Sequence, residues 1–401
     1  MKRVAALAVA TFSLAACQDP AAPPSVPAQP SLGQAAGGPG GGGETIPEQY
    51  IVVFRDDVAD VPGLAQRLAA QADAERRYTY EHAVKGFAGR MSAAAAAALA
   101  RNPAVAFVEQ DQVMHASATQ YMDGAGDPWG LDRINQRGLP LDKQYTYTYT
   151  GSGVRTYIID TGLDAAHAEF EGRAQNVYDA FGGNGNDCNG HGTHVGGTVG
   201  GKTYGVAKQA LVRGVKVLDC GGSGSTSGII SAVDWVQKNR INPAVANMSL
   251  GGGLSSTLNT AVNNLANSGV FVAVAAGNEN QAACNVSPAS AGAAFTTAAS
   301  TKTDYKASYS NHGSCVDAYA PGSAIKSAWI GSGTTETNTI SGTSMASPHV
   351  AGVSALVKHR YGDISSSSVT SYIKNAATAN VILGNVSGTP NLLLYKYVTA
   401  W

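Results

Sequence analysis

The fold class of this chain can be inferred from the stretch Val154-Arg155-Thr156-Tyr157-Ile158-Ile159-Asp160-Thr161-Gly162. A nearly unbroken apolar run that ends in a carboxylate and a glycine is typical of a strand buried on both faces of a parallel sheet. Two more runs, Leu211 to Leu218 and Val270 to Ala276, have the same character. Helical patterns alternate with these runs, at Ser227 to Asn239, Thr257 to Ser268 and Ser344 to Tyr361. We therefore predict an α/β domain over residues 118–401, with a mostly parallel central sheet, helices on both faces and ligands at the carboxyl ends of the strands.

A smaller unit precedes this domain, over residues 45–117. Its expected elements are a strand at Tyr50 to Phe54, a helix at Val61 to Arg76, a strand at Lys85 to Met91, a helix that is capped by Ser92 and runs to Ala100, and a strand at Val105 to Glu109. Such a module is compact and of the α+β class. By itself it could be a binding domain or a segment that assists folding.

The first 17 residues have the pattern of an export signal. The basic pair Lys2-Arg3 precedes an apolar stretch from Val4 to Ala16, which is too short to span a membrane. Its ending, Leu14-Ala15-Ala16-Cys17, resembles a lipobox, in which the cysteine is acylated and would anchor the precursor; the alternative is an ordinary cleaved signal. Residues 18–44 form a linker rich in Pro and Gly that cannot bury a core.

The charge balance excludes some partners. The chain has 27 Lys and Arg against 28 Asp and Glu, so its net charge is -1. It therefore has no long-range positive field to hold nucleic acid or an anionic membrane, and its partners must be chosen by a site.

The cysteines indicate an oxidising compartment. Apart from Cys17 there are four, namely Cys188, Cys220, Cys284 and Cys315. An even set in an exported chain favours two disulfides over free thiols. Four cysteines allow three pairings, and their spacing does not choose among them.

Two ionisable side chains stand at predicted strand and helix ends. Asp160 ends its strand at the edge where an open α/β sheet binds ligands, although an Asp there could also cap a turn. His191 lies in Asn189-Gly190-His191-Gly192-Thr193-His194, where small residues let the start of a helix pack closely on the sheet. His-x-x-His also suggests a metal. No Glu lies between the two histidines as it does in zinc proteases, so we interpret His194 as structural.

A serine and an amide stand at two further ends. Ser344 lies in Ser341-Gly342-Thr343-Ser344-Met345-Ala346-Ser347-Pro348-His349. A Ser at a helix start is usually an N-cap, but its small neighbours would let a substrate backbone come close, and Pro348 suits a first helical turn. The helix start also offers a backbone N–H and a positive dipole end to an oxyanion. Asn278, in Ala275-Ala276-Gly277-Asn278, is either an Asn turn or a side-chain donor to the same oxyanion.

These four residues fit one mechanism. Asp160 would orient His191, His191 would take the proton of Ser344, and Asn278 would stabilise the oxyanion while an acyl-enzyme forms. In the chain order Asp, His, Ser the sequence resembles the subtilisin-like serine proteases, and among them the aqualysin-like members of the proteinase K branch. The resemblance is carried by Trp129-Gly130-Leu131-Asp132-Arg133, Asp187-Cys188-Asn189-Gly190-His191-Gly192-Thr193-His194, Ala246-Asn247-Met248-Ser249-Leu250-Gly251-Gly252-Gly253 and Gly342-Thr343-Ser344-Met345-Ala346.

The resemblance implies how the chain matures. Residues 45–117 are similar to the inhibitor pro-segment of the family, which helps the protease fold and then fills its cleft. Ala118-Thr119-Gln120 resembles the start of a mature enzyme, so autocleavage is expected near the Ser117–Ala118 bond. The expected partners are polypeptide substrates and the chain's own pro-segment, and the expected product is a secreted monomer. Two other readings stay open: a catalytically silent binding protein, and a latent complex in which the pro-segment remains bound.

The resemblance also implies substrate-binding residues. The substrate would lie as an extended strand between two segments, Gly221-Gly222-Ser223-Gly224 and Ser249-Leu250-Gly251-Gly252. The pocket for the side chain before the scissile bond would have a floor of Ala275, Ala276 and Gly277. With no obvious charge in this pocket, we expect a broad specificity that leans toward apolar and aromatic residues.

Disulfides and calcium enter by resemblance as well. The branch pairs its cysteines in sequence order, which would join Cys188 to Cys220 and Cys284 to Cys315. Structural Ca²⁺ would bind to the Asp317 carboxylate with backbone carbonyls near Gly292 and Ala294. A second site would use Asp132, Gln136 and Asp142, with Asn135 and Gln144 in place of the ligands of relatives.

Overall fold

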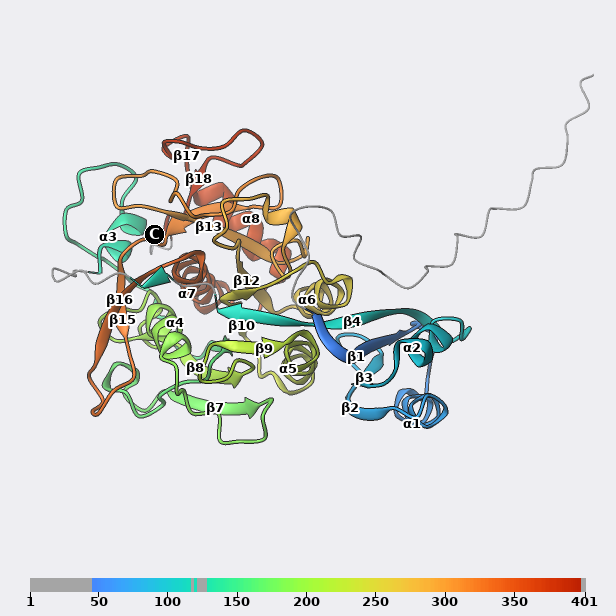
Figure 1. Ribbon diagram of the computed structural model, residues 1–401. Coiled ribbons are helices and arrows are strands. Elements are labelled where there is room, and N and C mark those ends of the chain that lie inside the picture. Colours follow the sequence, from blue (N-terminus) through green and yellow to red (C-terminus); the bar gives the residue numbers. More distant parts are fainter. Residues whose placement is uncertain (1–44, 117–118, 121–127, 398–401) are drawn as a thin grey trace, which may run out of the picture. The chain divides into compact units, whose positions relative to one another are not determined.

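The computed structural model describes residues 45–116, 119–120 and 128–397 (Figure 1). Cys17 and the linker over residues 18–44 lie outside these residues. Within the described part of the chain, no helix is both long enough and apolar enough to cross a membrane.

The unit before the large domain is an antiparallel sheet covered by two helices. Its elements are β1 (Thr45–Phe54), α1 (Val61–Gln71), β2 (Glu75–Tyr80), β3 (Gly86–Arg90), α2 (Ala93–Leu99) and β4 (Val105–Ala116). The strands pair in the order β4-β1-β3-β2, and the helices bury their apolar faces on Val52, Phe87 and Val108. Ser92 caps α2 as predicted, since its Oγ accepts the Ala95 N–H at 3.2 Å.

Two predicted elements of this unit have different lengths in the structure. The first helix was expected to reach Arg76 but ends at Gln71, because Asp73 adopts a φ of 49° and the chain turns into β2. β2 pairs with β3, so tertiary pairing overrides the local helical pattern. The last strand was expected to end at Glu109 and continues to Ala116.

The large domain is built on a mostly parallel sheet, as predicted. In the described residues this sheet has nine strands, ordered β17-β18-β14-β13-β12-β10-β6-β8-β7. All pairs are parallel except β17 with β18. The strands are β6 (Arg155–Asp160), β7 (Ala174–Asp179), β8 (Leu211–Lys216), β10 (Ala244–Met248), β12 (Phe271–Ala275), β13 (Phe295–Ser300), β14 (Ala318–Pro321), β17 (Thr378–Ala379) and β18 (Leu392–Leu393).

The remaining elements surround this sheet. The helices are α3 (Trp129–Asn135), α4 (His191–Gly200), α5 (Thr226–Asn239), α6 (Ser256–Asn267), α7 (Thr343–Tyr361) and α8 (Ser366–Ala376), with short 3₁₀ turns at Ala168–Phe170 and Ala283–Asn285. The small strands are β5 (Thr119–Gln120), β9 (Ser223–Ser225), β11 (Leu250–Gly251), β15 (Ile325–Ala328) and β16 (Thr337–Ser341).

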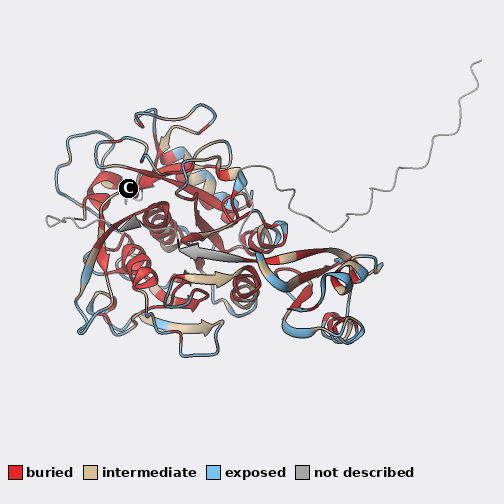
Figure 2. Ribbon diagram, viewed as in Figure 1, coloured by how far each residue is buried: buried red, intermediate tan, exposed pale blue. Residues whose placement is uncertain are grey.

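The alternation of side chains along the strands divides the core in two. In β6, Ile158 packs with α4 and α7 on one face of the sheet, whereas Tyr157 and Ile159 pack with α5 and α6 on the other. Figure 2 shows that the central strands and α7 are almost wholly buried. Helices therefore cover both faces, and α4 and α7 begin at the carboxyl edge of the sheet.

The sheet of the first unit continues into the large domain. β4 pairs antiparallel with β9 on one side and with β11 on the other. The register joins His115 to Ser223 in β9 and to Gly251 in β11. The last residues of the pro-segment thus lie as an extended strand between two strands of the large domain.

Candidate active site

Asp160 and His191 form a buried pair at the carboxyl edge of the sheet. Asp160 is the last residue of β6 and His191 the first of α4, and His191 Nδ1 lies 2.7 Å from Asp160 Oδ1. The Asp160 side chain is fully buried and that of His191 is 3% exposed. With Nδ1–H donating to the carboxylate, Nε2 is left as an acceptor. Nε2 is buried and has no hydrogen-bond partner among the residues that the structure describes.

The electrostatics of this pair favour protonation of the imidazole. Burial lowers the pKa of His191, but the charge of Asp160, its hydrogen bond and the charge of Asp187 together outweigh burial. The net pKa of His191 is raised above its ordinary value of 6.5. An imidazole whose cation is stabilised in this way suits a base that holds a proton transiently.

Asp187, which the sequence analysis quoted only as part of a motif, holds the start of α4. Its Oδ1 accepts from Thr161 Oγ1 and from the Gly190 N–H, each at 2.9 Å, and its Oδ2 accepts from the Thr193 N–H, also at 2.9 Å. Gly190 has a φ of 105°, and a Cβ there would lie 2.4 Å from the Trp329 ring, so only glycine fits. A carboxylate shortly before Gly-His-Gly-Thr is a capping pattern that could have revealed this role.

Ser344 is the second residue of α7. Gly342 precedes the helix and provides no side-chain cap. The N–H groups of the first turn of α7 must therefore be bonded by other segments. The Ser344 side chain is buried, and its Oγ donates to the Ser249 carbonyl at 3.2 Å. Pro348 was expected in the first helical turn, but the helix begins at Thr343 and Pro348 lies inside it, in the second turn.

Asn278 follows β12 and faces the start of α7. Its Oδ1 accepts from the Thr343 N–H at 2.9 Å and from Thr343 Oγ1 at 3.0 Å. These two bonds fix the amide, and its Nδ2 is buried without a partner in the described part of the chain. Asn278 therefore holds a buried donor, and His191 a buried acceptor, that no described residue satisfies and that a ligand could.

His194 has the structural role that we predicted for it. Its Nε2 lies 2.9 Å from the Ile325 carbonyl oxygen, inside the core under α4. Burial lowers the pKa of His194 to about 3, so the ring is neutral at physiological pH.

The two segments expected to bind substrate flank β4. Ser223 and Gly224 pair with it from β9, and Leu250 and Gly251 from β11. The other expected residues lie beside these edges. Gly221 and Gly222 form a turn on Asp219, Gly252 bonds to Ser287, and Ser249 contacts Ser344.

The expected pocket floor lies at the end of β12. Ala275, Ala276 and Gly277 are all buried. Gly277 has a φ of 100°, and a Cβ there would meet Asn311 Nδ2 at 2.2 Å. The same Cβ would lie 2.7 Å from Glu279 Oε2, so a carboxylate stands close behind this floor.

Disulfides join Cys188 to Cys220 and Cys284 to Cys315, the pairing in sequence order. The first one links the loop before α4 to the loop that leads into β9. The Asn189 side chain adds a hydrogen bond to the Cys220 carbonyl at 3.0 Å. The His191 loop and the β9 edge are thus tied together.

The first calcium site expected from the sequence does not fit a metal ion well. Asp317 Oδ1 lies 3.0 Å from the Lys374 ammonium, and Asp317 Oδ2 accepts the Thr296 N–H at 2.9 Å. Each oxygen has one partner, and one of the two partners is an ammonium. The positive charge of Lys374 would oppose a Ca²⁺ ion bound by Asp317 with the carbonyls of Gly292 and Ala294.

The second expected calcium site fits better. Asp132 Oδ2 accepts the Lys143 N–H at 2.7 Å, while its Oδ1 is buried and has no partner within the described residues. Burial raises the pKa of Asp132, and the nearby carboxylate of Asp142 raises it further. Gln136 Oε1 accepts the Asp142 N–H at 3.1 Å, so hydrogen bonds connect Asp132 in α3 with the loop that carries Gln136 and Asp142. The described residues contain no cluster of three or more His, Cys, Asp or Glu side chains suited to a metal.

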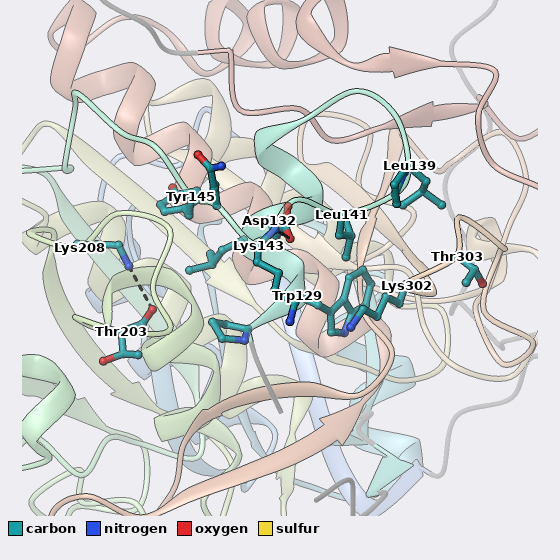
Figure 3. Close-up of a pocket in the computed structure, with 14 residues that line it drawn as sticks. Trp129, Asp132, Leu139, Leu141, Lys143, Tyr145, Thr203, Lys208, Lys302 and Thr303 are labelled. Carbon is teal, nitrogen blue, oxygen red and sulfur yellow. Dashed lines mark hydrogen bonds between the residues drawn. The ribbon is translucent and has the colours of Figure 1, made fainter. Parts of the chain in front are cut away.

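A cavity of about 940 Å³ opens beside Asp132, as Figure 3 shows. Its wall combines apolar side chains, among them Trp129 and Leu141, with the ammonium of Lys208. Burial lowers the pKa of Lys208 to about 8. None of the four candidate catalytic residues lines this cavity in the described structure.

Comparisons with known proteins agree with the fold and the site. The subtilase family matches residues 151–392, and the peptidase inhibitor I9 family matches residues 49–117. The chain is 50% identical over 375 residues to an extracellular serine proteinase of Thermus sp. strain Rt41A, with 88% of this chain and 90% of that protein covered. It is 44% identical over 364 residues to proteinase R of Parengyodontium album, with 88% and 90% covered.

A solved structure is similar as well. The crystal structure of a cold-adapted subtilisin-like serine proteinase is 50% identical and matches with a TM-score of 0.65, over 68% of this chain and 98% of that one. The resemblance inferred from the sequence motifs is thereby confirmed. The chain belongs to the subtilase family of serine proteases and carries an I9 inhibitor-type pro-segment ahead of its catalytic domain.

Proposed function

We propose that the protease cleaves internal peptide bonds with Ser344 as nucleophile. Ser344 Oγ attacks the scissile carbonyl carbon while His191 Nε2 takes its proton, and the oxyanion accepts from Asn278 Nδ2 and the Ser344 N–H. His191 then protonates the leaving amine, and water hydrolyses the acyl-enzyme by the same route. Two observations carry this proposal: His191 Nε2 and Asn278 Nδ2 are buried without a hydrogen-bond partner among the described residues, and Asn278 is bonded to Thr343 at the start of the helix that carries Ser344.

Labelling with a sulfonyl fluoride tests the proposal directly. We expect one equivalent of label on the processed protein, located on Ser344 by peptide mass, and none on Ser344→Ala. A protein that binds peptides but takes up no label would be the catalytically silent alternative. Equal labelling of Ser344→Ala would assign the nucleophile to another residue.

We propose in addition that the first substrate is the chain itself. β4 is paired with β9 as far as His115 and with β11 as far as Ala116, and the chain pairs again where Thr119 and Gln120 meet Ser341 and Ile340 of β16. Ser117 and Ala118 lie outside the described residues, but in sequence they separate these two paired segments, and β16 ends at Ser341, two residues before α7. We therefore propose cleavage at Ser117–Ala118. The intact mass should show a chain starting near Ala118 for the wild type and an uncut chain for Ser344→Ala.

After cleavage the pro-segment would act as an inhibitor, because it is held by contacts other than the cleaved bond. Glu109 accepts from Ser255 Oγ and from Ser256 Oγ at the start of α6. Asp111 accepts from the Ser227 N–H at 2.9 Å at the start of α5. Both carboxylates face the positive ends of helices, which favours negative charge there. If the pro-segment never dissociates, purified protein will keep both pieces and stay inactive, as the latent reading requires.

We propose a broad specificity with a preference for apolar or aromatic side chains before the scissile bond. The small floor residues Ala275, Ala276 and Gly277 leave room for a large side chain. The floor itself carries no charged side chain, and the Glu279 carboxylate behind it accepts the Asn311 amide at 2.8 Å. A peptide library will check this, and a strict preference for Arg or Lys would contradict it.

We propose that calcium stabilises the protease through the loop of Asp132 and Asp142. A bound Ca²⁺ would supply positive charge to the unpartnered Asp132 oxygen and cross-link the loop. A chelator should lower the melting temperature of the wild type and of Asp317→Asn equally, and should leave that of Asp132→Asn unchanged. A chelator effect that disappears in Asp317→Asn instead would move the site to Asp317.

The similar serine proteinase of Thermus sp. strain Rt41A is extracellular by name. We propose that this protease is likewise exported and acts as a monomer, while acylation of Cys17 stays a prediction. The intact mass of the precursor and of the protein in the medium will show whether Cys17 is acylated. Light scattering will show whether the protein is a monomer.

A further inference from the structure

The nucleophile helix contains an internal proline at a specific distance from the nucleophile. Pro348 has no N–H, so it cannot bond to the carbonyl four residues earlier, and a proline ring also crowds that carbonyl. That carbonyl belongs to Ser344. The helix therefore lacks its own hydrogen bond at the residue on which the proposed chemistry depends.

Another segment satisfies this carbonyl. Ser249 Oγ donates to the Ser344 carbonyl oxygen at 2.8 Å. Asn247 Nδ2 donates to Ser249 Oγ at 2.9 Å and fixes the hydroxyl, while Ser347 Oγ donates to Asn247 Oδ1 at 2.7 Å. The side chains of Ser249, Ser344 and Ser347 are 0% exposed and that of Asn247 is 1% exposed.

The same two residues meet a second time. Ser344 Oγ donates to the Ser249 carbonyl at 3.2 Å, so the backbone and side chain of Ser249 face the side chain and backbone of Ser344. Because water is excluded here, a lost bond would leave a buried carbonyl without a partner. The end of β10 thus holds the first turns of α7 at the point where proline weakens them.

We propose that Asn247 and Ser249 are positioning residues for the nucleophile: the Ser249 hydroxyl replaces the helical hydrogen bond that Pro348 removes and so fixes the backbone of Ser344. This inference rests on the proposed role of Ser344. Both Ser344 Oγ and the Ser344 N–H project from that backbone, so a small shift of it displaces attack and oxyanion binding together. Misplacement by about 1 Å can reduce a rate about 100-fold.

Four proteins test the replacement: wild type, Ser249→Ala, Pro348→Ala and the double variant. In Pro348→Ala the restored N–H can bond to the Ser344 carbonyl, which makes the hydroxyl dispensable. We expect Ser249→Ala to lower the rate constant of labelling by a sulfonyl fluoride about 10- to 100-fold in the wild-type background, and less than about threefold in the Pro348→Ala background. The kcat of peptide cleavage should follow the labelling rate, with little change in KM.

Variants that mature slowly are processed with a trace of wild type, and intact mass then follows the label on each protein separately. Asn247→Ala is a second variant in case Ser249→Ala does not fold. It should also lower the rate constant of labelling, and this decrease should be smaller in the Pro348→Ala background. Ser354→Ala is the matched control, because this buried serine of α7 donates only to Ala351 in its own helix, at 2.7 Å. Its labelling rate should equal that of the wild type.

The outcomes separate this inference from the proposed function. Equal losses from Ser249→Ala in both backgrounds, with wild type labelled on Ser344, would overturn the positioning role alone. A wild type that takes up no label, or a Ser344→Ala variant that does, would overturn the proposed function instead.

Discussion

The starts of α4 and α7 carry the two reacting side chains, His191 and Ser344, and they are held in opposite ways. Each helix follows a glycine that provides no side-chain cap. The start of α4 is held by Asp187, whose bonds to Gly190 and Thr193 span three and six residues, and by the disulfide that joins Cys188 to Cys220, 32 residues away. The start of α7 is held from about 65 to 100 residues away, by Asn278, Ser249 and Asn247.

The difference shows what each residue must do. His191 must change its charge during the reaction, and the carboxylates of Asp160 and Asp187 stabilise its cation. Ser344 must present an oxygen and an N–H to one substrate carbonyl, so its surroundings are neutral hydrogen bonds that fix position. Substitutions at Asp160, Asn278 and Asp187 test whether the two helix starts differ in this way.

The largest effect is expected at the charge that orients the imidazole. Asp160→Asn should reduce kcat about 10,000-fold, because an amide that donates to Nδ1 leaves the proton on Nε2, in the wrong tautomer. The measurement is kcat on a chromogenic peptide, with melting temperature as the check on folding. A loss below about tenfold would show that Asp160 does not set the tautomer.

On the α7 side, Asn278→Ala should reduce kcat about 100- to 1,000-fold with little change in KM, because it removes one donor to the oxyanion. The same change also frees the Thr343 N–H that Asn278 Oδ1 now accepts. Asn278→Asp keeps that acceptor and removes the donor. Should Asn278→Asp retain full activity, the oxyanion role would be excluded.

A smaller effect is expected from Asp187→Asn, which should lower kcat/KM about tenfold. The substitution loosens the start of α4 and removes a negative charge near His191. Its amide cannot accept the Thr193 N–H at the nitrogen end, and the loss of its charge lowers the pKa of His191. The base must be neutral to act, so the acidic limb of the kcat/KM profile should move to lower pH. Besides burial, which lowers it, the groups that act on the pKa of His191 are Asp160 and Asp187, and both raise it.

Asp179→Asn is the control for that shift. Asp179 also accepts backbone N–H groups in a loop, from Phe181 and Gly185, but it does not contact α4. Its variant should keep the wild-type pH profile. If both variants shift the acidic limb equally, the effect belongs to net charge and not to Asp187.

The smallest effect on catalysis is expected at the pro-segment. Glu109→Gln should leave the kcat of the mature enzyme unchanged and weaken inhibition by the added pro-segment about 10-fold, because a charge at the α6 N-terminus is lost. The measurement is the inhibition constant of the separate pro-segment. Arg55→Gln, on the same unit but bonded only to Pro103 within it, is the control. An unchanged constant for Glu109→Gln would show that β4 pairing alone holds the inhibitor.

The fold class and the candidate catalytic residues could be predicted from the sequence, because both depend on local patterns. Apolar runs such as the one ending at Asp160 are read directly, and small residues around His191 and Ser344 mark places where a backbone must come close. The family motifs then gave the pro-segment and the cysteine pairing that the spacing had left open.

The side chains that support those residues could be identified only from tertiary contacts. The extension of β4 to Ala116 depends on its pairing with β9 and β11, and the residue pattern of β4 does not predict it. The pairing of Lys374 with Asp317, and of Ser249 with the carbonyl that Pro348 leaves open, joins segments 57 and 95 residues apart. Such contacts depend on how strands and helices pack. The type of a side chain indicates which partners it can bind, but only the tertiary structure determines which of them lies within reach.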